Sequence, residues 1–189
     1  MFCQSGYQVF SKCLKMSSYD YLEIGVFNGD SVAGLARQFP SKIIYGIDPF
    51  IEDGYTTHTS NVERGSIMST QKQTAHNNTK DLSNVVLFET CSIDFATMLT
   101  DEMVVDMNVG WVLIDGSHHY NDVVVDMHLA MRLIGERAGG IVFDDVNVPE
   151  VGQAYQEWLE IYKDQIGPVS DIYLKDPGHI LFHPINMKG

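Results

Sequence analysis

Residues 22–31, LEIGVFNGDS, decide the predicted fold of this chain. An apolar run leads into this stretch and helix-like spacing follows it, so it predicts a strand, a glycine loop and the start of a helix. Gly25 and Gly29 let the backbone turn sharply and approach a ligand closely, which a Cβ would block. The loop amides and the helix N-terminus then face the polar or anionic end of that ligand. The spacing differs from the G-x-G-x-x-G of dinucleotide-binding proteins and from a P-loop, which needs Lys-Ser/Thr.

The next apolar run, residues 42–47, ends in Asp48. Asp48 follows Gly25 by 23 residues, where an acid is placed to accept hydrogen bonds from a ribose diol. Its alternative role is to cap a helix or to form the turn before Pro49. The loop and the acid together favour a nucleoside ligand.

Short apolar runs alternate with helix-like stretches along the rest of the chain. Five runs are rich in Ile, Val, Leu and Phe, as strands buried on both faces are: 19–24, 42–47, 84–89, 110–114 and 140–143. Helices are predicted between them and after the last, at 31–39, 66–80, 93–100, 121–136 and 151–163. This alternation predicts an α/β domain with a parallel sheet and helices on both faces.

The last two runs, 169–174 and 179–183, break the alternation. The residues between them include Pro177 and Gly178 and are too few for a crossover, so they predict an antiparallel hairpin. Residues 1–18 are predicted to form a preceding amphipathic helix. The polar stretch 49–65 forms either a lid over a ligand or an exposed loop. No repeat or second domain is visible, so residues 1–189 are interpreted as one domain.

The composition limits the partners. The chain has 189 residues, with 12 Lys+Arg against 25 Asp+Glu and a net charge of −13. This acidity argues against nucleic acid, which requires a basic face, and against an anionic membrane surface. Three cysteines make no C-x-x-C pair, so we expect free thiols in a reducing, cytoplasmic setting. We expect neither a signal peptide nor a membrane span, because no apolar run is long enough.

The motif E-x-G-x-x-x-G-x-S, from Glu23 to Ser31, resembles class I S-adenosylmethionine-dependent methyltransferases. It is similar to the form found in small-molecule O-methyltransferases of the catechol, sugar and macrolide types, and the resemblance extends over residues 18–185. It implies a Rossmann-like, doubly wound, seven-stranded sheet of order 3-2-1-4-5-7-6. In that order the last strand lies antiparallel beside the fifth, which accounts for the predicted hairpin.

The resemblance also assigns cofactor-binding residues. It implies that the methionine end lies against Gly25, Asn28, Gly29 and Ser31. Asp48 would hold the ribose hydroxyls, and Glu23 would lie under the loop and hold its amides or the amino group of the ligand. Ser92 matches the residue that contacts adenine, and it is also placed to cap the helix at 93–100.

Two predicted strands end in acids, Asp115 after the fourth and Asp144 and Asp145 after the fifth. In the expected strand order these carboxylates converge, which is costly unless a cation such as Mg²⁺ compensates them. The resemblance implies a metal site here, because metal-dependent members of this group use one acid after the fourth strand and an Asp-Asp or Asp-Asn pair after the fifth. Asp115 is also assigned to the cofactor and catalytic groups. The alternatives are that Asp144 caps the following turn and that Asp145 pairs with Lys or Arg.

His118 lies three residues after Asp115, where the catechol type has the lysine that takes the hydroxyl proton. Histidine suits that role near neutral pH, and the string I-D-G-x-H-x-Y resembles that of a wide group of such methyltransferases. The alternative is a structural loop residue. On the following helix, Asp126 and His128 are expected at the surface or behind the site.

The leading hypothesis is therefore methyl transfer from S-adenosylmethionine to a hydroxyl of a small molecule, a sugar, glycoside or phenol, with help from a divalent metal. The alternative is a non-catalytic module that binds S-adenosylmethionine or another nucleoside. The acids and His118 favour the enzyme, because a binding module does not need them near the sulfonium. Relatives often form dimers or larger assemblies, so a homo-oligomer is left open.

Overall fold

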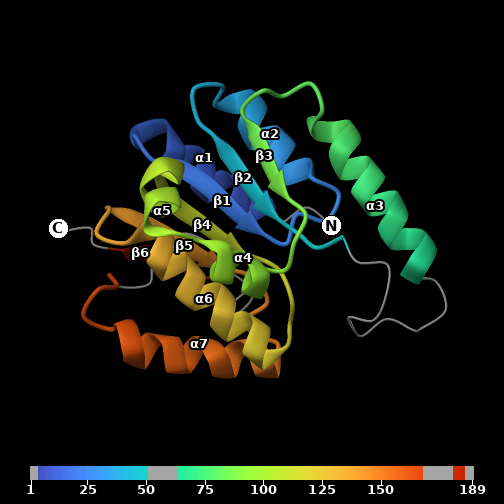
Figure 1. The fold of residues 1–189 in the computed structure, drawn as a ribbon. Coiled ribbons are helices and arrows are strands. Elements are labelled where there is room, and N and C mark those ends of the chain that lie inside the picture. Colours follow the sequence, from blue (N-terminus) through green and yellow to red (C-terminus); the bar gives the residue numbers. More distant parts are fainter. Residues whose placement is uncertain (1–3, 51–63, 168–180, 186–189) are drawn as a thin grey trace.

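The computed structural model describes residues 4–50, 64–167 and 181–185. At its centre is a six-stranded sheet of order β3-β2-β1-β4-β5-β6 (Figure 1). The strands are β1 (Asp20–Ile24), β2 (Ile44–Ile47), β3 (Val85–Phe88), β4 (Val109–Ile114), β5 (Gly139–Phe143) and β6 (Leu181–Ile185). The first five are parallel, and β6 pairs antiparallel with β5.

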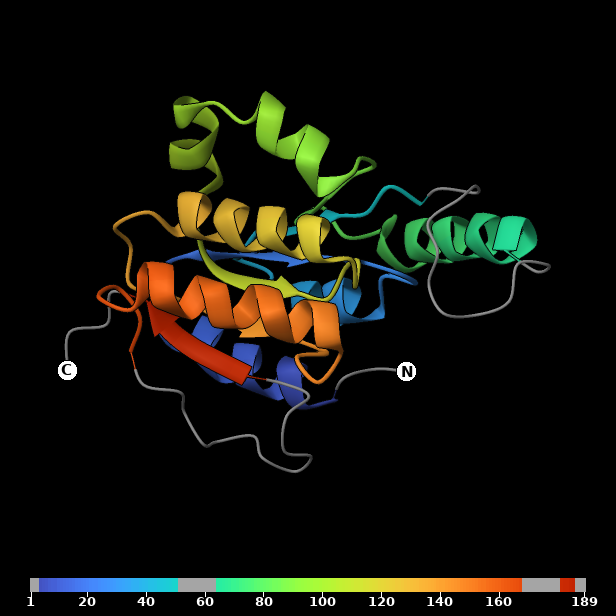
Figure 2. The same ribbon diagram turned by 90° about the horizontal axis from the view of Figure 1, so that it is seen from below.

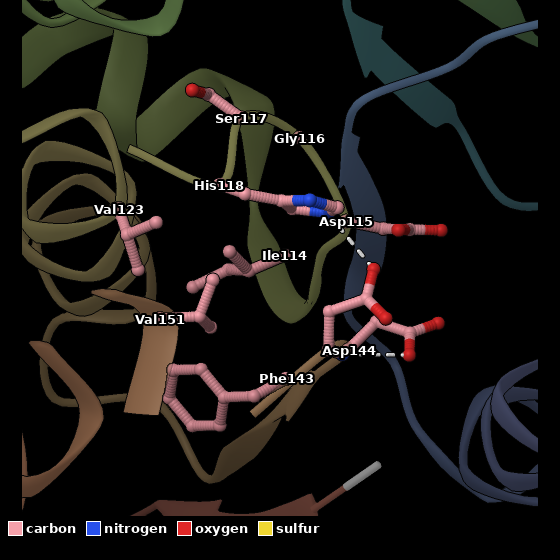
Figure 3. Close-up of a pocket in the computed structure, with 10 residues that line it drawn as sticks. Ile114, Asp115, Gly116, Ser117, His118, Val123, Phe143, Asp144 and Val151 are labelled. Carbon is pink, nitrogen blue, oxygen red and sulfur yellow. Dashed lines mark hydrogen bonds and ion pairs between the residues drawn. The ribbon is translucent and has the colours of Figure 1, made fainter. Parts of the chain in front are cut away.

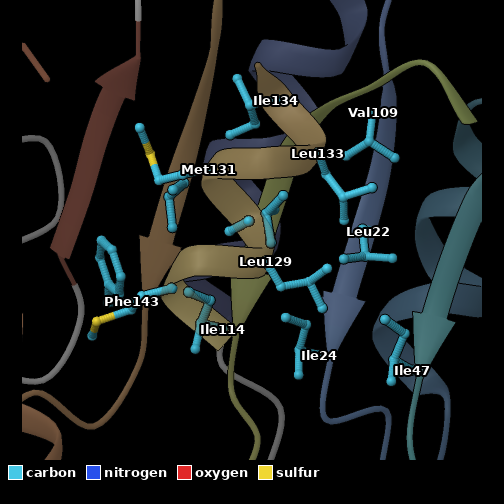
Figure 4. Close-up of a cluster of buried hydrophobic side chains, with 14 of the residues drawn as sticks. Leu22, Ile24, Ile47, Val109, Ile114, Leu129, Met131, Leu133, Ile134 and Phe143 are labelled. Carbon is cyan, nitrogen blue, oxygen red and sulfur yellow. The ribbon is translucent and has the colours of Figure 1, made fainter. Parts of the chain in front are cut away.

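Strand side chains alternate between two apolar cores, one on each face of the sheet. In β1, Leu22 and Ile24 enter one core and Tyr21 enters the other; in β4, Ile114 and Leu113 divide in the same way. Figure 4 shows the first core, where α6 packs on the central strands. Burial on both faces explains why the strand sequences are apolar throughout rather than alternating.

Helices cover both faces of the sheet in the described part of the chain. They are α1 (Gln4–Met16), α2 (Asp30–Gln38), α3 (Arg64–Thr79), α4 (Ser92–Met98), α5 (Asp101–Met107), α6 (Tyr120–Ile134) and α7 (Pro149–Tyr162). The first three contribute to one core and the last four to the other (Figures 1 and 2). None of these described helices is both long and apolar enough to cross a membrane.

The predicted Rossmann-like sheet is confirmed for six of its seven strands in the described residues, with the parallel strands in the expected order and an antiparallel strand beside β5. That strand, β6, is the counterpart of the run predicted at 179–183. Beyond it, Ile166 forms an antiparallel bridge with Ile185, and the Gly167 N–H donates to the Pro184 carbonyl at 2.8 Å. The run predicted at 169–174 lies outside the described residues, as does most of the stretch 49–65.

One helix prediction is incomplete. The stretch between β3 and β4 was predicted to hold a single helix at 93–100, but it holds both α4 and α5. The second helix begins at Thr100, whose side chain accepts a hydrogen bond from the Met103 N–H at 3.2 Å. A threonine followed by two acids is a typical helix N-terminus. The sequence signal for α5 was therefore present at Thr100, which was interpreted as the last residue of the preceding helix.

Candidate active site

Two glycines shape the loop between β1 and α2. Gly25 has φ +91°, and a Cβ there would lie 2.0 Å from the carbonyl oxygen of Asp115. Gly29 has φ +72° and packs on α3, where a Cβ would lie 3.1 Å from the Cα of Ala75. Left-handed φ and close backbone packing together require glycine at both positions. The predicted tight turn is confirmed. The space that a Cβ atom would need is occupied by the backbone of Asp115 at the first glycine and by Ala75 at the second.

Asp48, at the carboxyl end of β2, ties this loop to the sheet. Its Oδ2 accepts hydrogen bonds from the N–H groups of Val26 and Phe27, both at 2.9 Å, and its Oδ1 accepts one from Phe50 at 2.8 Å. Burial raises the pKa of Asp48, and these three bonds act in the opposite direction. A carboxylate offers about four lone-pair sites, so acceptor capacity remains for a ribose diol. The turn-forming role of Asp48 is seen directly; its ribose role stays a prediction.

Glu23 lies beneath the loop and is 2% exposed. The Tyr21 hydroxyl donates to its Oε2 at 2.9 Å, and the Ser31 hydroxyl donates to its Oε1. Its partners in the protein are thus hydroxyls and not the loop amides, and the other role that the resemblance implied, holding the amino group of the ligand, stays a prediction. Burial raises the pKa of Glu23 to about 7, and the charge of Asp48 adds to this against the two hydroxyl bonds. A cationic group bound nearby would favour the charged form of Glu23.

The sequence reasoning missed Phe27. This residue has φ 52° and its side chain is 51% exposed in the middle of the loop. A left-handed φ is a strained conformation for a bulky residue, and such strain concentrates at functional sites. The bond from its N–H to Asp48 helps to hold the conformation. A large apolar residue between two glycines of a tight turn is the signal that could have identified it.

The other predicted cofactor residues lie around the same edge. The Asn28 carbonyl accepts a bond from Nδ2 of Asn78 in α3 at 2.9 Å, so α3 is anchored to the loop. Ser92 is the first residue of α4, and the helix is capped by Cys91 without a side-chain bond. The prediction that Ser92 caps this helix is therefore wrong. The Ser92 hydroxyl instead hydrogen-bonds the carboxyl of Asp126.

The predicted catalytic residues line one small pocket at the carboxyl ends of β4 and β5 (Figure 3). His118 Nε2 lies 2.9 Å from Asp145 Oδ2. Asp145 has a left-handed φ of 54°, and its N–H donates to Asp144 Oδ1 at 2.8 Å. The local turn therefore directs the Asp145 carboxylate toward His118. The pairing of Asp145 with Lys or Arg, left open by the sequence, is not what the structure shows.

Asp115 lies in the same pocket beside the glycine loop. Its side chain is exposed to solvent, but the walls of the pocket pack around its carboxyl group and partly desolvate it. This burial raises the pKa of Asp115 to about 8, and the charges of Asp144, Glu23 and Asp145 raise it further. The predicted convergence of acids is thus reflected in the raised pKa of Asp115. A positively charged ligand would relieve it.

The metal expectation is not met by this geometry. Within residues 4–50, 64–167 and 181–185, no three His, Cys, Asp or Glu side chains are grouped so that they could hold a metal ion. Asp115, Asp144 and Asp145 share the pocket, but Asp145 is engaged by His118 and the Asp115 carboxyl points away from that ion pair (Figure 3). The three carboxylates therefore do not form the expected ligand set.

The turn that carries His118 is held from two sides. The Ser117 hydroxyl donates to Asp122 Oδ2 at 2.7 Å within the β4–α6 segment. Glu150 of α7 accepts the Tyr120 N–H at 2.8 Å, and its carboxylate lies 3.9 Å from Nδ1 of His119. These contacts fix the loop on either side of His118 and leave its ring facing Asp145.

Asp126 was expected at the surface or behind the site, and it is buried, only 1% exposed. His128 is not buried; its Nδ1 lies 2.7 Å from the Tyr162 hydroxyl. Asp126 follows Val123 by three residues and precedes Ala130 by four, so it falls within the apolar stripe of α6. The position of Asp126 within this apolar stripe was the sequence signal for its burial. Here the position on the helix decides the burial, and the polarity of the side chain does not.

A doubly wound sheet of this order, with a glycine loop after β1 and acids after β2, β4 and β5, is the arrangement expected of a class I S-adenosylmethionine-dependent methyltransferase. The model of the Methyltransferase domain family (Methyltransf_24) matches residues 22–146, from β1 to the turn after β5. The chain belongs to this family. A search of the curated proteins finds no match.

Solved structures share the fold at low sequence identity. Calicheamicin methyltransferase CalS11 is similar with a TM-score of 0.68 and 12% identity, over 95% of this chain and 77% of that one. A Staphylococcus aureus protein assigned as a caffeoyl-CoA O-methyltransferase gives 0.65 and 16%, over 100% and 85%. Precorrin-6y C5,15-methyltransferase from Geobacter metallireducens gives 0.60 and 16%, over 99% and 90%. The fold is therefore common to enzymes named for different acceptors.

Proposed function

We propose that this methyltransferase transfers the methyl group of S-adenosylmethionine to a hydroxyl oxygen of a small molecule, a sugar, glycoside or phenol. The observation that carries the proposal is the close contact between the His118 ring and the Asp145 carboxylate, at 2.9 Å, in the pocket beside the glycine loop. An alcohol or phenol must lose its proton as its oxygen is methylated, and a carboxylate-oriented imidazole is suited to take it. The sugar and caffeoyl-CoA O-methyltransferases with this fold support an oxygen acceptor.

The acidic edge fits a sulfonium cofactor. The pKa values of Glu23, Asp48 and Asp115 are all raised, and burial is the largest cause for each. The charge of Asp48 adds to the shift of Glu23, and the charges of Asp144, Glu23 and Asp145 add to that of Asp115. A cation bound among them offsets that repulsion. When bound, S-adenosylmethionine supplies an electrophilic methyl group on a positively charged sulfur. We assign the methionine end to the loop at Gly25, Asn28, Gly29 and Ser31, the ribose to Asp48 and the adenine to Ser92.

His118 is the proposed general base. Asp145 Oδ2 lies 2.9 Å from Nε2, so its carboxylate favours a proton on that nitrogen and leaves Nδ1 with a lone pair for the hydroxyl proton. As the new C–O bond forms, the C–S bond breaks, S-adenosylhomocysteine leaves and the proton stays on Nδ1. Asp145 then stabilises the imidazolium. The remaining rate enhancement comes from positioning the acceptor oxygen in line with the methyl group.

A divalent metal was part of the expected function, and this step does not use one. The carboxylates that would hold it do not form a ligand group in the described residues. Assay in EDTA tests this point by itself: we expect methyl transfer to stay within about twofold of the untreated rate. Loss of activity that Mg²⁺ restores would show that Asp145 leaves His118 to bind a metal.

His118→Gln tests the proposed base. We expect it to lower methyl transfer by about 10²–10⁴-fold, the usual contribution of general acid–base catalysis, while binding of S-adenosylhomocysteine is retained. The matched control is the adjacent His119→Gln, which should keep activity within a few-fold. The measurement is formation of S-adenosylhomocysteine over a panel of sugars, glycosides and phenols. Full activity of His118→Gln would overturn the assignment, and binding without turnover of any acceptor by the wild type would favour the non-catalytic module.

The cofactor assignment has its own test by isothermal titration with S-adenosylhomocysteine. Wild type should bind, and Asp48→Ala should bind at least tenfold more weakly, because the variant loses both the predicted ribose acceptor and three backbone hydrogen bonds. Glu102→Gln, which removes an exposed acid of α5, serves as the charge-matched control. Equal affinity of wild type and Asp48→Ala would contradict the assignment.

A further inference from the structure

Asp126 is a buried acid that the proposed reaction does not use. It projects from α6 into the interior and is 1% exposed. Its Oδ1 is buried and has no hydrogen-bond partner among residues 4–50, 64–167 and 181–185. Burying a carboxyl without full hydrogen bonding costs stability, and an apolar side chain would fit the surrounding stripe at a lower cost. A cost of this kind is expected where a residue serves a binding site.

Asp126 lies between the start of α4, where the adenine is predicted to bind, and the turn after β4, which lines the active-site pocket. On one side its carboxyl bonds the Ser92 hydroxyl at the first turn of α4. On the other side it lies under Gly116 in the turn after β4, where a Cβ would be 3.4 Å from its Oδ2. The two elements, α4 and α6, lie side by side on one face of the sheet (Figure 1). Asp126 is thus the polar group between the α4 start and the β4–α6 turn.

We propose that Asp126 is a positioning residue of the cofactor site: it couples Ser92, where the adenine is assigned, to the turn at Gly116, which lines the active-site pocket. The inference rests on the proposed function, because it needs S-adenosylmethionine bound at this edge. Asp126 is too deep to touch the ligand, and it acts through Ser92 and Gly116. Its neighbour one turn earlier, Asp122, holds Ser117 in a similar way, so this face of α6 supports the whole turn.

The electrostatics agree with this buried role. Burial raises the pKa of Asp126 to about 7, the nearby charge of Asp122 adds to it, and the Ser92 bond opposes it. The side chain therefore carries a proton for part of the time near neutral pH. Because asparagine is neutral and has the same shape, Asp126→Asn should preserve the coupling to Ser92. A leucine fills the space but cannot bond.

The test is isothermal titration of the full chain with S-adenosylhomocysteine. We expect Asp126→Leu to weaken binding at least tenfold and Asp126→Asn to stay within threefold of wild type. Leu133→Ala, a large-to-small change in the core at the far end of α6, controls for general loss of stability and should bind within twofold. Wild-type affinity in a folded Asp126→Leu would overturn the inference.

A double-mutant cycle shows whether Asp126 acts through Ser92. If it does, Ser92→Ala combined with Asp126→Leu should bind no more weakly than the weaker single variant. Additive losses would overturn the proposed coupling. If Asp126→Leu does not fold, the cycle is run with Asp126→Ala, judged by the same criterion. Failure of the wild type to bind S-adenosylhomocysteine would instead count against the proposed function, which separates the two.

Discussion

At the scale of single residues, three acids are distinguished by strongly raised pKa values. Glu23, Asp115 and Asp126 all have pKa values raised to about 7 or 8, with burial as the leading cause. They are protonated more readily in the folded state than in the unfolded chain. Each therefore links folding to pH, and the sign of the linkage is the same for all three.

Glu23 gives the clearest pH prediction. Its folded pKa is raised from 4.5 to about 7, so its contribution is fully present below pH 4.5 and is lost as pH rises through 7. Glu23→Gln, which is always neutral, should remove this loss. We expect the difference in unfolding free energy, variant minus wild type, to increase by up to about 3 kcal/mol from pH 4.5 to pH 8. Urea titrations at the two pH values measure it, and parallel pH profiles would contradict the account.

Phe27 provides a prediction about backbone strain. Phe27→Ala and Phe27→Gly both remove the ring, but only glycine accepts φ 52° without strain. We expect the glycine variant to be more stable than the alanine variant by about 1 kcal/mol. At Val105, which is exposed in α5, the order should reverse, with glycine less stable by about 1 kcal/mol. Thermal unfolding of the four variants measures this, and the same order at both sites would refute the strain.

The sequence predicted much of the site because strand ends are marked by composition. Asp48, Asp115, Asp144 and Asp145 each follow an apolar run, and parallel strands bring their carboxyl ends to one edge. The sequence did not predict the partner of each acid. Asp145 pairs with His118 through a left-handed turn, and Asp126 is buried by its place in a helical stripe. Local dihedrals and helix orientation decide such contacts, and residue type does not encode them.

At the scale of elements, the side-chain contacts between β6 and α7 are the feature that the sequence did not predict. His183 of β6 is 1% exposed, and its Nε2 lies 2.5 Å from the Tyr155 hydroxyl of α7. Phe143 and Trp158 surround the pair with their rings. Burial lowers the pKa of His183, so the ring is held neutral and its pairing with Tyr155 satisfies two buried polar groups.

Tyr155→Phe tests this attachment. Removing the hydroxyl leaves Nε2 of His183 buried without its partner, so we expect a loss of about 1–3 kcal/mol of unfolding free energy. Tyr162→Phe is the matched control, because its hydroxyl bonds His128 on the exposed side of α6 and α7. That control should cost less than about 1 kcal/mol. Chemical denaturation compares the two, and equal losses would show that the buried pair does not stabilise β6.

At the scale of the whole molecule, the acids behind the net charge of −13 are unevenly distributed. Five of the 25 acids lie at the carboxyl edge of the sheet, namely Glu23, Asp48, Asp115, Asp144 and Asp145. Their mutual repulsion and burial prepare that edge for a cationic ligand. The alternation of runs predicted a parallel sheet with helices on both faces, and the strand order was predictable because the resemblance to class I methyltransferases implied it. The acceptor was not, because the same fold serves enzymes named for oxygen and carbon methylation.

The most direct test of the account follows the methyl group itself. Wild type is incubated with S-adenosylmethionine carrying a CD₃ group and a panel of sugars, glycosides and phenols, and the product is examined by mass spectrometry and NMR. The account predicts a product with the label on a hydroxyl oxygen, formed by wild type and by His119→Gln and lost in His118→Gln. A label on carbon or nitrogen, or an oxygen-labelled product made equally well by His118→Gln, would contradict it.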